Sequence, residues 1–170
     1  MMKKETYLKC MEYVKSQKNG VKIICFLGKL LTYVTAVCYS VVLFVTFFSG
    51  RYKETVVYIA VPGVSFVLLS LFRSHYNAAR PYEIYGFVPL IPKDTVGKSF
   101  PSRHVFSIFV IGSSIIYGYP NIGINILCMG VMLAAIRVIV GVHFPKDVIA
   151  GGIIGMLCGV FAFCVLLFWR

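Results

Sequence analysis

Long apolar stretches separated by short polar segments dominate this 170-residue chain. Leu30 to Phe48 contains no charged residue, and as a helix it would extend about 28 Å, close to the hydrocarbon thickness of a bilayer. Similar stretches follow at Thr55–Phe72, Val105–Tyr117, Ile122–Ile136 and Val148–Trp169. The pattern predicts an all-α, polytopic transmembrane helix bundle of about five spans, formed by a single domain covering residues 1–170.

The first 21 residues have a different pattern, in which lysines alternate with apolar residues. Tyr7, Leu8, Met11 and Val14 recur at helical spacing, which predicts an interfacial amphipathic helix over residues 1–21. Seven lysines lie in the first 29 residues and contribute to the net charge of +11. Such a basic segment favours anionic lipid headgroups. No basic surface interleaved with aromatic residues lies outside the apolar stretches, so we expect membrane lipids and no nucleic acid as partners.

Residues 73–103 form the longest polar connection, and polar loops of this length usually have a function. This loop leaves the second predicted span at Arg73 and enters the third at His104. Two spans later the chain returns to the same side, at Arg137 to Asp147. Five spans therefore place three polar clusters at one membrane face, where fixed charge is costly unless it has a function.

The middle cluster is Phe100-Pro101-Ser102-Arg103-His104. Proline and serine before an apolar run predict a helix start with Ser102 as N-cap, and free N–H groups there favour an anion. Arg103 adds a guanidinium, and His104 lies in the first turn. Ordinary anchoring at the membrane interface is the alternative interpretation of this cluster.

The last cluster places His143 and Asp147 four residues apart, on one face of a helix that begins near Pro145. A carboxylate bonded to one imidazole nitrogen fixes the tautomer and leaves the other nitrogen able to attack. Arg137 could contact the same phosphate. A structural His–Asp pair that ties a loop to a helix end is the alternative.

Arg73 and Arg80 are seven residues apart and would share a helix face if the second span continued past Arg73. Guanidinium groups match the oxygens of phosphate and stay charged where water is scarce. Two arginines at a span boundary often only anchor headgroups. Their occurrence together with two histidines and a carboxylate predicts a site for a phosphate anion and a phosphohistidine.

The three clusters together resemble the signature of the type 2 phosphatidic acid phosphatase superfamily. Its pattern is Lys-x6-Arg-Pro, then Pro-Ser-Gly-His, then Ser-Arg-x5-His-x3-Asp. This chain has Arg73-x6-Arg80-Pro81, Pro101-Ser102-Arg103-His104 and Arg137-x5-His143-x3-Asp147. The order and the internal spacings agree. Arg73 replaces the lysine, Arg103 the glycine and Ile136 the serine of the pattern.

The resemblance implies a role for each matching position. His143 would be the nucleophile, Asp147 would orient it, and His104 would protonate the leaving oxygen and later help to activate water. The phosphoryl oxygens would be held by Arg73, Arg80, Ser102, Arg103 and Arg137. The resemblance implies neither a metal nor another cofactor, because the cations supply the charge stabilisation.

These expectations define a membrane-integral, metal-independent phosphatase of a lipid phosphate or diphosphate. Undecaprenyl diphosphate, phosphatidylglycerophosphate, phosphatidic acid and a lipid A phosphate are candidate substrates by family analogy. One alternative is a noncatalytic protein that binds lipid phosphate and retains the cationic site. Another is a metal hydrolase with His104, His143 and Asp147 as ligands.

Two considerations predict opposite orientations of the protein in the membrane. Five spans place the basic N-terminus and the site loops on one side, which the positive-inside rule would make cytoplasmic. The superfamily typically works at the outer face. We expect a bacterial cell membrane protein with its site on the extracytoplasmic side.

Overall fold

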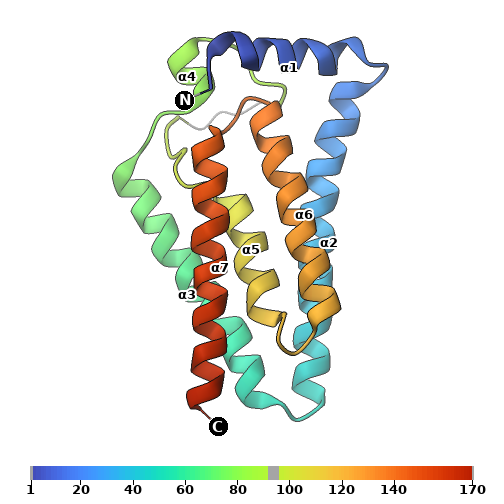
Figure 1. The fold of residues 1–170 in the computed structure, drawn as a ribbon, viewed down its shortest axis with the longest axis vertical. Coiled ribbons are helices and arrows are strands. Elements are labelled where there is room, and N and C mark those ends of the chain that lie inside the picture. Colours follow the sequence, from blue (N-terminus) through green and yellow to red (C-terminus); the bar gives the residue numbers. More distant parts are fainter. Residues whose placement is uncertain (1, 92–95, 170) are drawn as a thin grey trace.

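The computed structural model describes residues 2–91 and 96–169, and these contain seven helices. Four long helices and one shorter helix run along the long axis, and another helix lies across one end of the bundle (Figure 1). The helices are α1 (Lys4–Ser16), α2 (Gly20–Phe48), α3 (Tyr52–Tyr76), α4 (Pro81–Tyr85), α5 (Arg103–Ile115), α6 (Pro120–Ile139) and α7 (Pro145–Phe168). The prediction of an all-helical bundle is confirmed.

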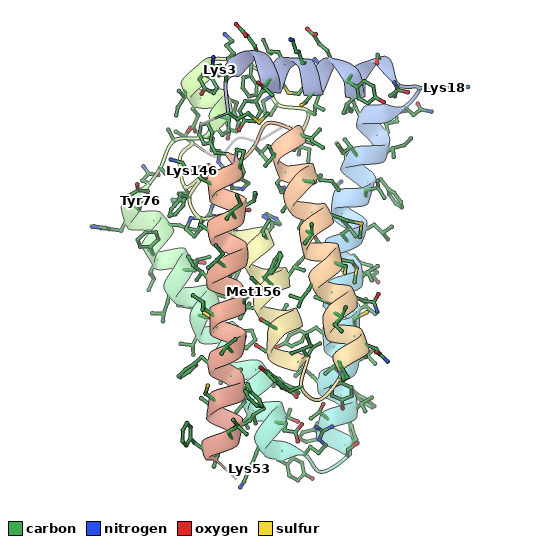
Figure 2. The ribbon with its side chains drawn as sticks, in the orientation of Figure 1. Lys3, Lys18, Lys53, Tyr76, Lys146 and Met156 are labelled. Carbon is green, nitrogen blue, oxygen red and sulfur yellow. The ribbon has the colours of Figure 1, made fainter. Side chains whose placement is uncertain are left out.

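Helices α2, α3, α6 and α7 are long and apolar enough to cross a membrane. Large apolar side chains such as Phe26, Phe44 and Leu157 are exposed on their outer faces, where lipid would cover them. Lys3 and Lys18 lie at one end of the molecule and Lys53 at the other, whereas Met156 lies between them (Figure 2). This distribution is that of an integral membrane protein.

Helix α5 is the shortest of the predicted spans. Its 13 residues extend only about 20 Å, less than the thickness of a bilayer core. Val105, Phe106 and Ile115 are completely buried, so α5 is enclosed by the other helices. The prediction of five spans therefore corresponds to four long helices around one short helix.

Glycines bring α7 close to α5. A methyl group added at Gly151 would lie 2.7 Å from the carbonyl oxygen of Ser102, and one at Gly155 would lie 2.8 Å from that of Phe106. The last helix thus packs against its neighbour through small residues. This contact places the first turns of both helices side by side.

Helix α1 lies across the end of the bundle and packs against the loops there (Figure 1). Tyr7 and Met11 are buried, whereas its lysines are exposed. The Tyr7 ring centroid lies 5.6 Å from that of Phe87 and 6.2 Å from that of Phe144. The amphipathic helix is therefore present, within narrower bounds than the predicted residues 1–21.

The first span begins earlier than predicted. Helix α2 starts at Gly20, so Lys22 and Lys29 lie inside it, whereas the sequence pattern placed the span from Leu30. Lysine has a high helix propensity, and its long stem lets the ammonium group reach polar surroundings. Charge was therefore a poor marker of where this helix begins.

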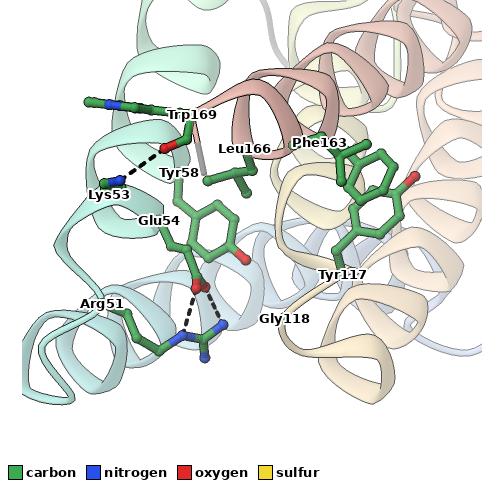
Figure 3. A pocket seen from close by; sticks show the side chains of 10 residues that line it. Arg51, Lys53, Glu54, Tyr58, Tyr117, Gly118, Phe163, Leu166 and Trp169 are labelled. Carbon is green, nitrogen blue, oxygen red and sulfur yellow. Dashed lines mark hydrogen bonds and ion pairs between the residues drawn. The ribbon is translucent and has the colours of Figure 1, made fainter.

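The opposite end of the bundle contains a small polar cavity of about 240 Å³ (Figure 3). Arg51 pairs with Glu54 beside Tyr58, and Lys53 Nζ donates to the carbonyl oxygen of Trp169 at 2.9 Å. None of the three sequence clusters contributes to its lining. These contacts close the end of the bundle far from the predicted site.

Candidate active site

The residues of the three sequence clusters gather at the end of the bundle that α1 covers. Five elements contribute them, and each contributes from its terminus or from a loop. They are Arg73 in the last turn of α3, Arg80 before α4, Ser102 to His104 at the start of α5, Arg137 in the last turn of α6, and His143 with Asp147 at the start of α7.

Arg73 is buried and holds the loop that precedes α5. Its two terminal nitrogens donate to the carbonyl oxygens of Pro101 and Lys98. Each guanidinium has five N–H donors, so these two bonds leave others for an anion.

Arg80 is also buried and holds two different loops. Its Nε donates to the carbonyl oxygen of Gly97 at 2.9 Å, and Nη1 donates to that of Val142 at 3.2 Å. Arg73 and Arg80 do not share a helix face, because α3 continues past Arg73 only as far as Tyr76. They reach the site from two elements instead of one.

Glu83 stabilises the loop around Arg80. Its carboxylate accepts from the backbone N–H of Arg80 at 2.7 Å and from that of Gly97 at 2.6 Å. The backbone N–H of Ser99 donates to the carbonyl oxygen of Ala78 at 2.8 Å. Residues 96–103 are thereby fixed against the segment that follows α3. Residues 92–95 of the predicted active-site loop lie outside the described residues.

His143 and Asp147 face each other, and a serine joins them. The His143 Nδ1 lies 3.5 Å from Asp147 Oδ2, which is longer than a good hydrogen bond. Ser99 Oγ donates to the same carboxylate oxygen at 2.5 Å and lies 3.5 Å from Nδ1. The backbone N–H of Phe144 also donates to Asp147 Oδ2, at 3.0 Å. Asp147 is thus held as an acceptor next to Nδ1, which leaves Nε2 as the other reactive nitrogen.

His143 is buried in the loop between α6 and α7, with only 3% of its surface exposed. Burial lowers its pKa from 6.5 to about 4, against the opposite effect of its bond to Asp147. Its imidazole is therefore neutral near pH 7, which is the form of a nucleophile. The hydroxyl of Tyr7 donates to the carbonyl oxygen of His143 at 3.1 Å, so α1 also fixes this loop.

Two buried side-chain donors, on residues whose backbones bond to this pair, have no protein partner in the part of the chain that the structure describes. They are the hydroxyl of Ser102 and Nε of Arg137. Ser102 N–H donates to the carbonyl oxygen of Asp147 at 2.8 Å, and His143 N–H donates to that of Arg137 at 3.3 Å. Ser102 has the N-cap position of α5, yet its side chain makes no capping bond. Unsatisfied buried donors are costly, and an anion at this position would satisfy them.

Arg103 and His104 line cavities at the start of α5. Arg103 is exposed, and its Cζ lies 5.4 Å from the ring centroid of Phe66 on α3. Both residues line a cavity of about 270 Å³ that α2 and α3 also line. His104 additionally lines a larger cavity of about 550 Å³ beside Arg137. The guanidinium of Arg103 is thus more exposed than those of Arg73, Arg80 and Arg137.

Sequence reasoning missed Ser99, which is buried and bonded to Asp147. Its position directly before the Phe100–His104 cluster is the only signal in the sequence. Within residues 2–91 and 96–169, no group of three His, Cys, Asp or Glu side chains is arranged to hold a metal ion.

Comparison with curated proteins connects the chain to bacterial enzymes. It is 29% identical over 100 residues to the bacitracin transport permease protein BcrC of Bacillus licheniformis, covering 59% of this chain and 49% of the relative. It is 30% identical over 112 residues to lipid A 1-phosphatase of Rhizobium johnstonii, and the match covers 60% of this chain and 46% of the relative. Undecaprenyl-diphosphatase BcrC of Bacillus subtilis is 24% identical over 143 residues, with 81% and 74% covered. The chain thus matches about half the length of the first two relatives.

Two crystal structures share the fold. Aquifex aeolicus LpxE superposes with a TM-score of 0.70 at 22% identity, covering 94% of this chain and 93% of that one. A PAP2-type phosphatidylglycerolphosphate phosphatase from Bacillus subtilis superposes with a TM-score of 0.68 at 19% identity, covering 95% of this chain and 86% of that one. The family model described as PAP2 superfamily matches residues 54–170, which include every residue of the three clusters. The chain therefore belongs to the PAP2 superfamily.

Proposed function

We propose that this protein is a membrane-integral, metal-independent phosphatase that hydrolyses a lipid phosphate or diphosphate through a phosphohistidine. The observation that carries the proposal is that Ser102 and Arg137, whose backbones bond to Asp147 and to His143, each keep a buried side-chain donor without a protein partner among the described residues, while the His143 imidazole is neutral. A phosphoryl group bound there would accept from both donors and from the remaining N–H groups of Arg73 and Arg80.

The first chemical step forms a bond between His143 Nε2 and phosphorus. Asp147, on the Nδ1 side, stabilises the imidazolium that develops as the bond forms. The bond between phosphorus and the leaving oxygen breaks, and that oxygen takes a proton from His104. The arginines offset the negative charge that spreads over the phosphoryl oxygens.

The second step regenerates the imidazole. His104 has given up its proton and now accepts one from water as the water oxygen attacks phosphorus. The P–N bond breaks, its electron pair returns to Nε2, and inorganic phosphate leaves. Each turnover therefore consumes one water and needs no further reactant.

A lipid substrate is supported by the position of the site. The site lies at the ends of apolar helices, and the cavities beside His104 are lined by the outward-facing helix α2 and by α3 and α6. A headgroup could therefore enter while its chains stay in the bilayer. The names of the relatives, lipid A 1-phosphatase and undecaprenyl-diphosphatase, describe reactions on lipid phosphates. We further propose the bacterial cell membrane and the extracytoplasmic side, the usual arrangement of the superfamily.

Phosphate release from short-chain phosphatidic acid and from farnesyl diphosphate tests the proposal in purified, detergent-solubilised protein. We expect release that is lost in His143→Ala, greatly reduced in His104→Ala, insensitive to EDTA and inhibited by vanadate. Removing a nucleophile of this kind costs about a millionfold in rate in well-studied hydrolases. Binding of the lipids without release by the wild-type protein would show the noncatalytic alternative instead. Loss of release on EDTA treatment would show a metal hydrolase.

A further inference from the structure

Lys29 is a cation inside a membrane helix. It follows the first residue of α2 by nine positions, which corresponds to about 14 Å along the helix axis. Among residues 2–91 and 96–169, Glu54 pairs with Arg51 and Asp147 faces the neutral ring of His143, and no carboxylate there forms an ion pair with Lys29. An ionisable residue at such a depth usually serves a binding or transport site.

The side chain of Lys29 lines the larger of the two cavities beside His104. This cavity has a volume of about 550 Å³, and Arg137 and His104 line it together with Thr32 and Tyr33 of α2. Both Thr32 and Tyr33 are exposed, which opens the cavity toward the lipid side of α2. Lys29 therefore shares a cavity, open on the side of α2, with the group that would protonate the leaving oxygen.

The position beside His104 belongs to the leaving group and not to the phosphoryl group that is transferred. If the leaving group is a neutral alcohol such as diacylglycerol, a cation there stabilises no charge. If the leaving group is a lipid monophosphate, its oxygens carry negative charge next to Lys29, and this charge increases as the P–O bond breaks. A lysine ammonium is a suitable point charge for such a phosphate.

We propose that Lys29 binds the phosphate of the leaving group and makes the protein selective for lipid diphosphates over lipid monophosphates. This inference rests on the phosphatase function proposed above. The terminal phosphoryl group would bind to His143 and the buried arginines, and the phosphate attached to the lipid would lie in the cavity with Lys29. The bridging P–O bond breaks, the bridging oxygen takes the proton of His104, and a lipid monophosphate and inorganic phosphate are the products.

The competing explanation is that Lys29 only extends its stem toward lipid headgroups at the membrane surface. Such a lysine would affect both kinds of substrate equally, because it would act on the fold or on the membrane. Farnesyl diphosphate and farnesyl monophosphate separate the two explanations, because they share the same chain and differ by one phosphate. Lys22 provides a matched control, since it is a lysine on the same helix that lines neither cavity.

The experiment measures kcat/KM of wild type, Lys29→Met, Lys29→Arg and Lys22→Met on both farnesyl substrates. Losing one charge-assisted contact should lower kcat/KM of Lys29→Met for the diphosphate by about tenfold or more. The value for the monophosphate should change by less than about twofold, as expected for an exposed side chain that it does not contact. Lys29→Arg should retain the preference, and Lys22→Met should behave as wild type.

Equal losses on both substrates in Lys29→Met, or no loss on either, would overturn the assignment of Lys29 and leave the phosphatase function in place. A wild-type protein that prefers the monophosphate would overturn it in the same way. Absence of phosphate release from every lipid, with binding retained, would overturn the phosphatase function itself and this inference with it.

Discussion

His143 is held in an environment that excludes its charged form. The loop between α6 and α7 buries the ring, and burial lowers its pKa to about 4. A lowered pKa means that the folded protein keeps the imidazole neutral as the pH falls from 6.5 toward 4, whereas an unfolded chain would take up a proton. The proposed nucleophile would therefore stay neutral at mildly acidic pH.

This burial predicts the titration of His143. At pH 5.5 an ordinary imidazole with a pKa of about 6.5 is about nine-tenths protonated, whereas His143 should remain largely neutral. NMR of protein with ¹³C-labelled histidine in detergent micelles measures this, and His143→Gln identifies the resonance. A titration midpoint near 6.5 would show that the ring is hydrated and that the burial described here does not hold.

At the scale of single residues, the sequence predicted contacts between side chains that lie close together in the chain. His143 and Asp147 are four positions apart across a helix start, so spacing alone was enough to pair them. Ser99 bonds to Asp147 across 48 positions, and no spacing rule reaches that far. Arg103 was expected among the phosphate ligands, and the structure adds a contact with the Phe66 ring of α3 that no spacing rule predicts. The roles of all these residues stay predictions until they are measured.

Helices α5 and α7 together align the candidate site, because their first turns carry His104 and Asp147. Their backbones approach each other through glycines of α7, and a direct bond joins Ser102 N–H to the carbonyl oxygen of Asp147 at 2.8 Å. A change in the distance between these helices would thus move the proposed acid relative to the proposed nucleophile.

Gly155→Ala should therefore destabilise the protein by about 1–3 kcal/mol. The added methyl group would lie 2.7 Å from Phe109 Cβ, 2.8 Å from the Phe106 carbonyl oxygen and 2.9 Å from Val110 N, and backbone atoms cannot move aside. Gly63→Ala on α3 is the matched control, because nothing lies within 4 Å of its added methyl group. Thermal unfolding in detergent measures both variants. Equal melting temperatures would mean that α5 and α7 are not packed this closely.

Element boundaries were the less predictable part of the fold. The apolar stretches located the long helices, because only a helix satisfies its backbone within lipid. Charged residues marked the start of the first predicted span at Leu30 and the end of the second at Phe72, whereas α2 begins at Gly20 and α3 continues to Tyr76. Helix α2 includes two lysines, and α3 ends at Tyr76, where Asn77 adopts a left-handed conformation with φ of 42°. The short helix α4 inside the polar loop was not predicted.

At the scale of the whole molecule, an argument from sequence order correctly placed the three clusters at one end. Each span reverses the direction of the chain, so polar segments separated by two spans must return to the same side. Sequence order does not determine which side of the membrane that is. The lysine-rich α1 lies at the same end as the site, which the positive-inside rule alone would place in the cytoplasm.

Cysteine labelling in intact cells tests the proposed orientation. In a background without native cysteines, a membrane-impermeant maleimide should label Val88→Cys and not Tyr52→Cys. Val88 is 82% exposed beside the site loops, and Tyr52 is 60% exposed at the opposite end, so both sulfurs would be accessible from their own side. Labelling of Tyr52→Cys alone would place the site in the cytoplasm, and permeabilised cells should label both variants.

The hydrogen bonds that Arg73 and Arg80 donate to backbone carbonyl oxygens have a consequence for the proposed turnover. These two side chains are oriented by the peptide groups at 97, 98, 101 and 142, and not by a bound anion. The proposed phosphate site is therefore preorganised, so binding of a headgroup there would require little reorganisation energy. In the proposed reaction the same framework would persist after inorganic phosphate leaves, and the next cycle would start without rebuilding the binding geometry.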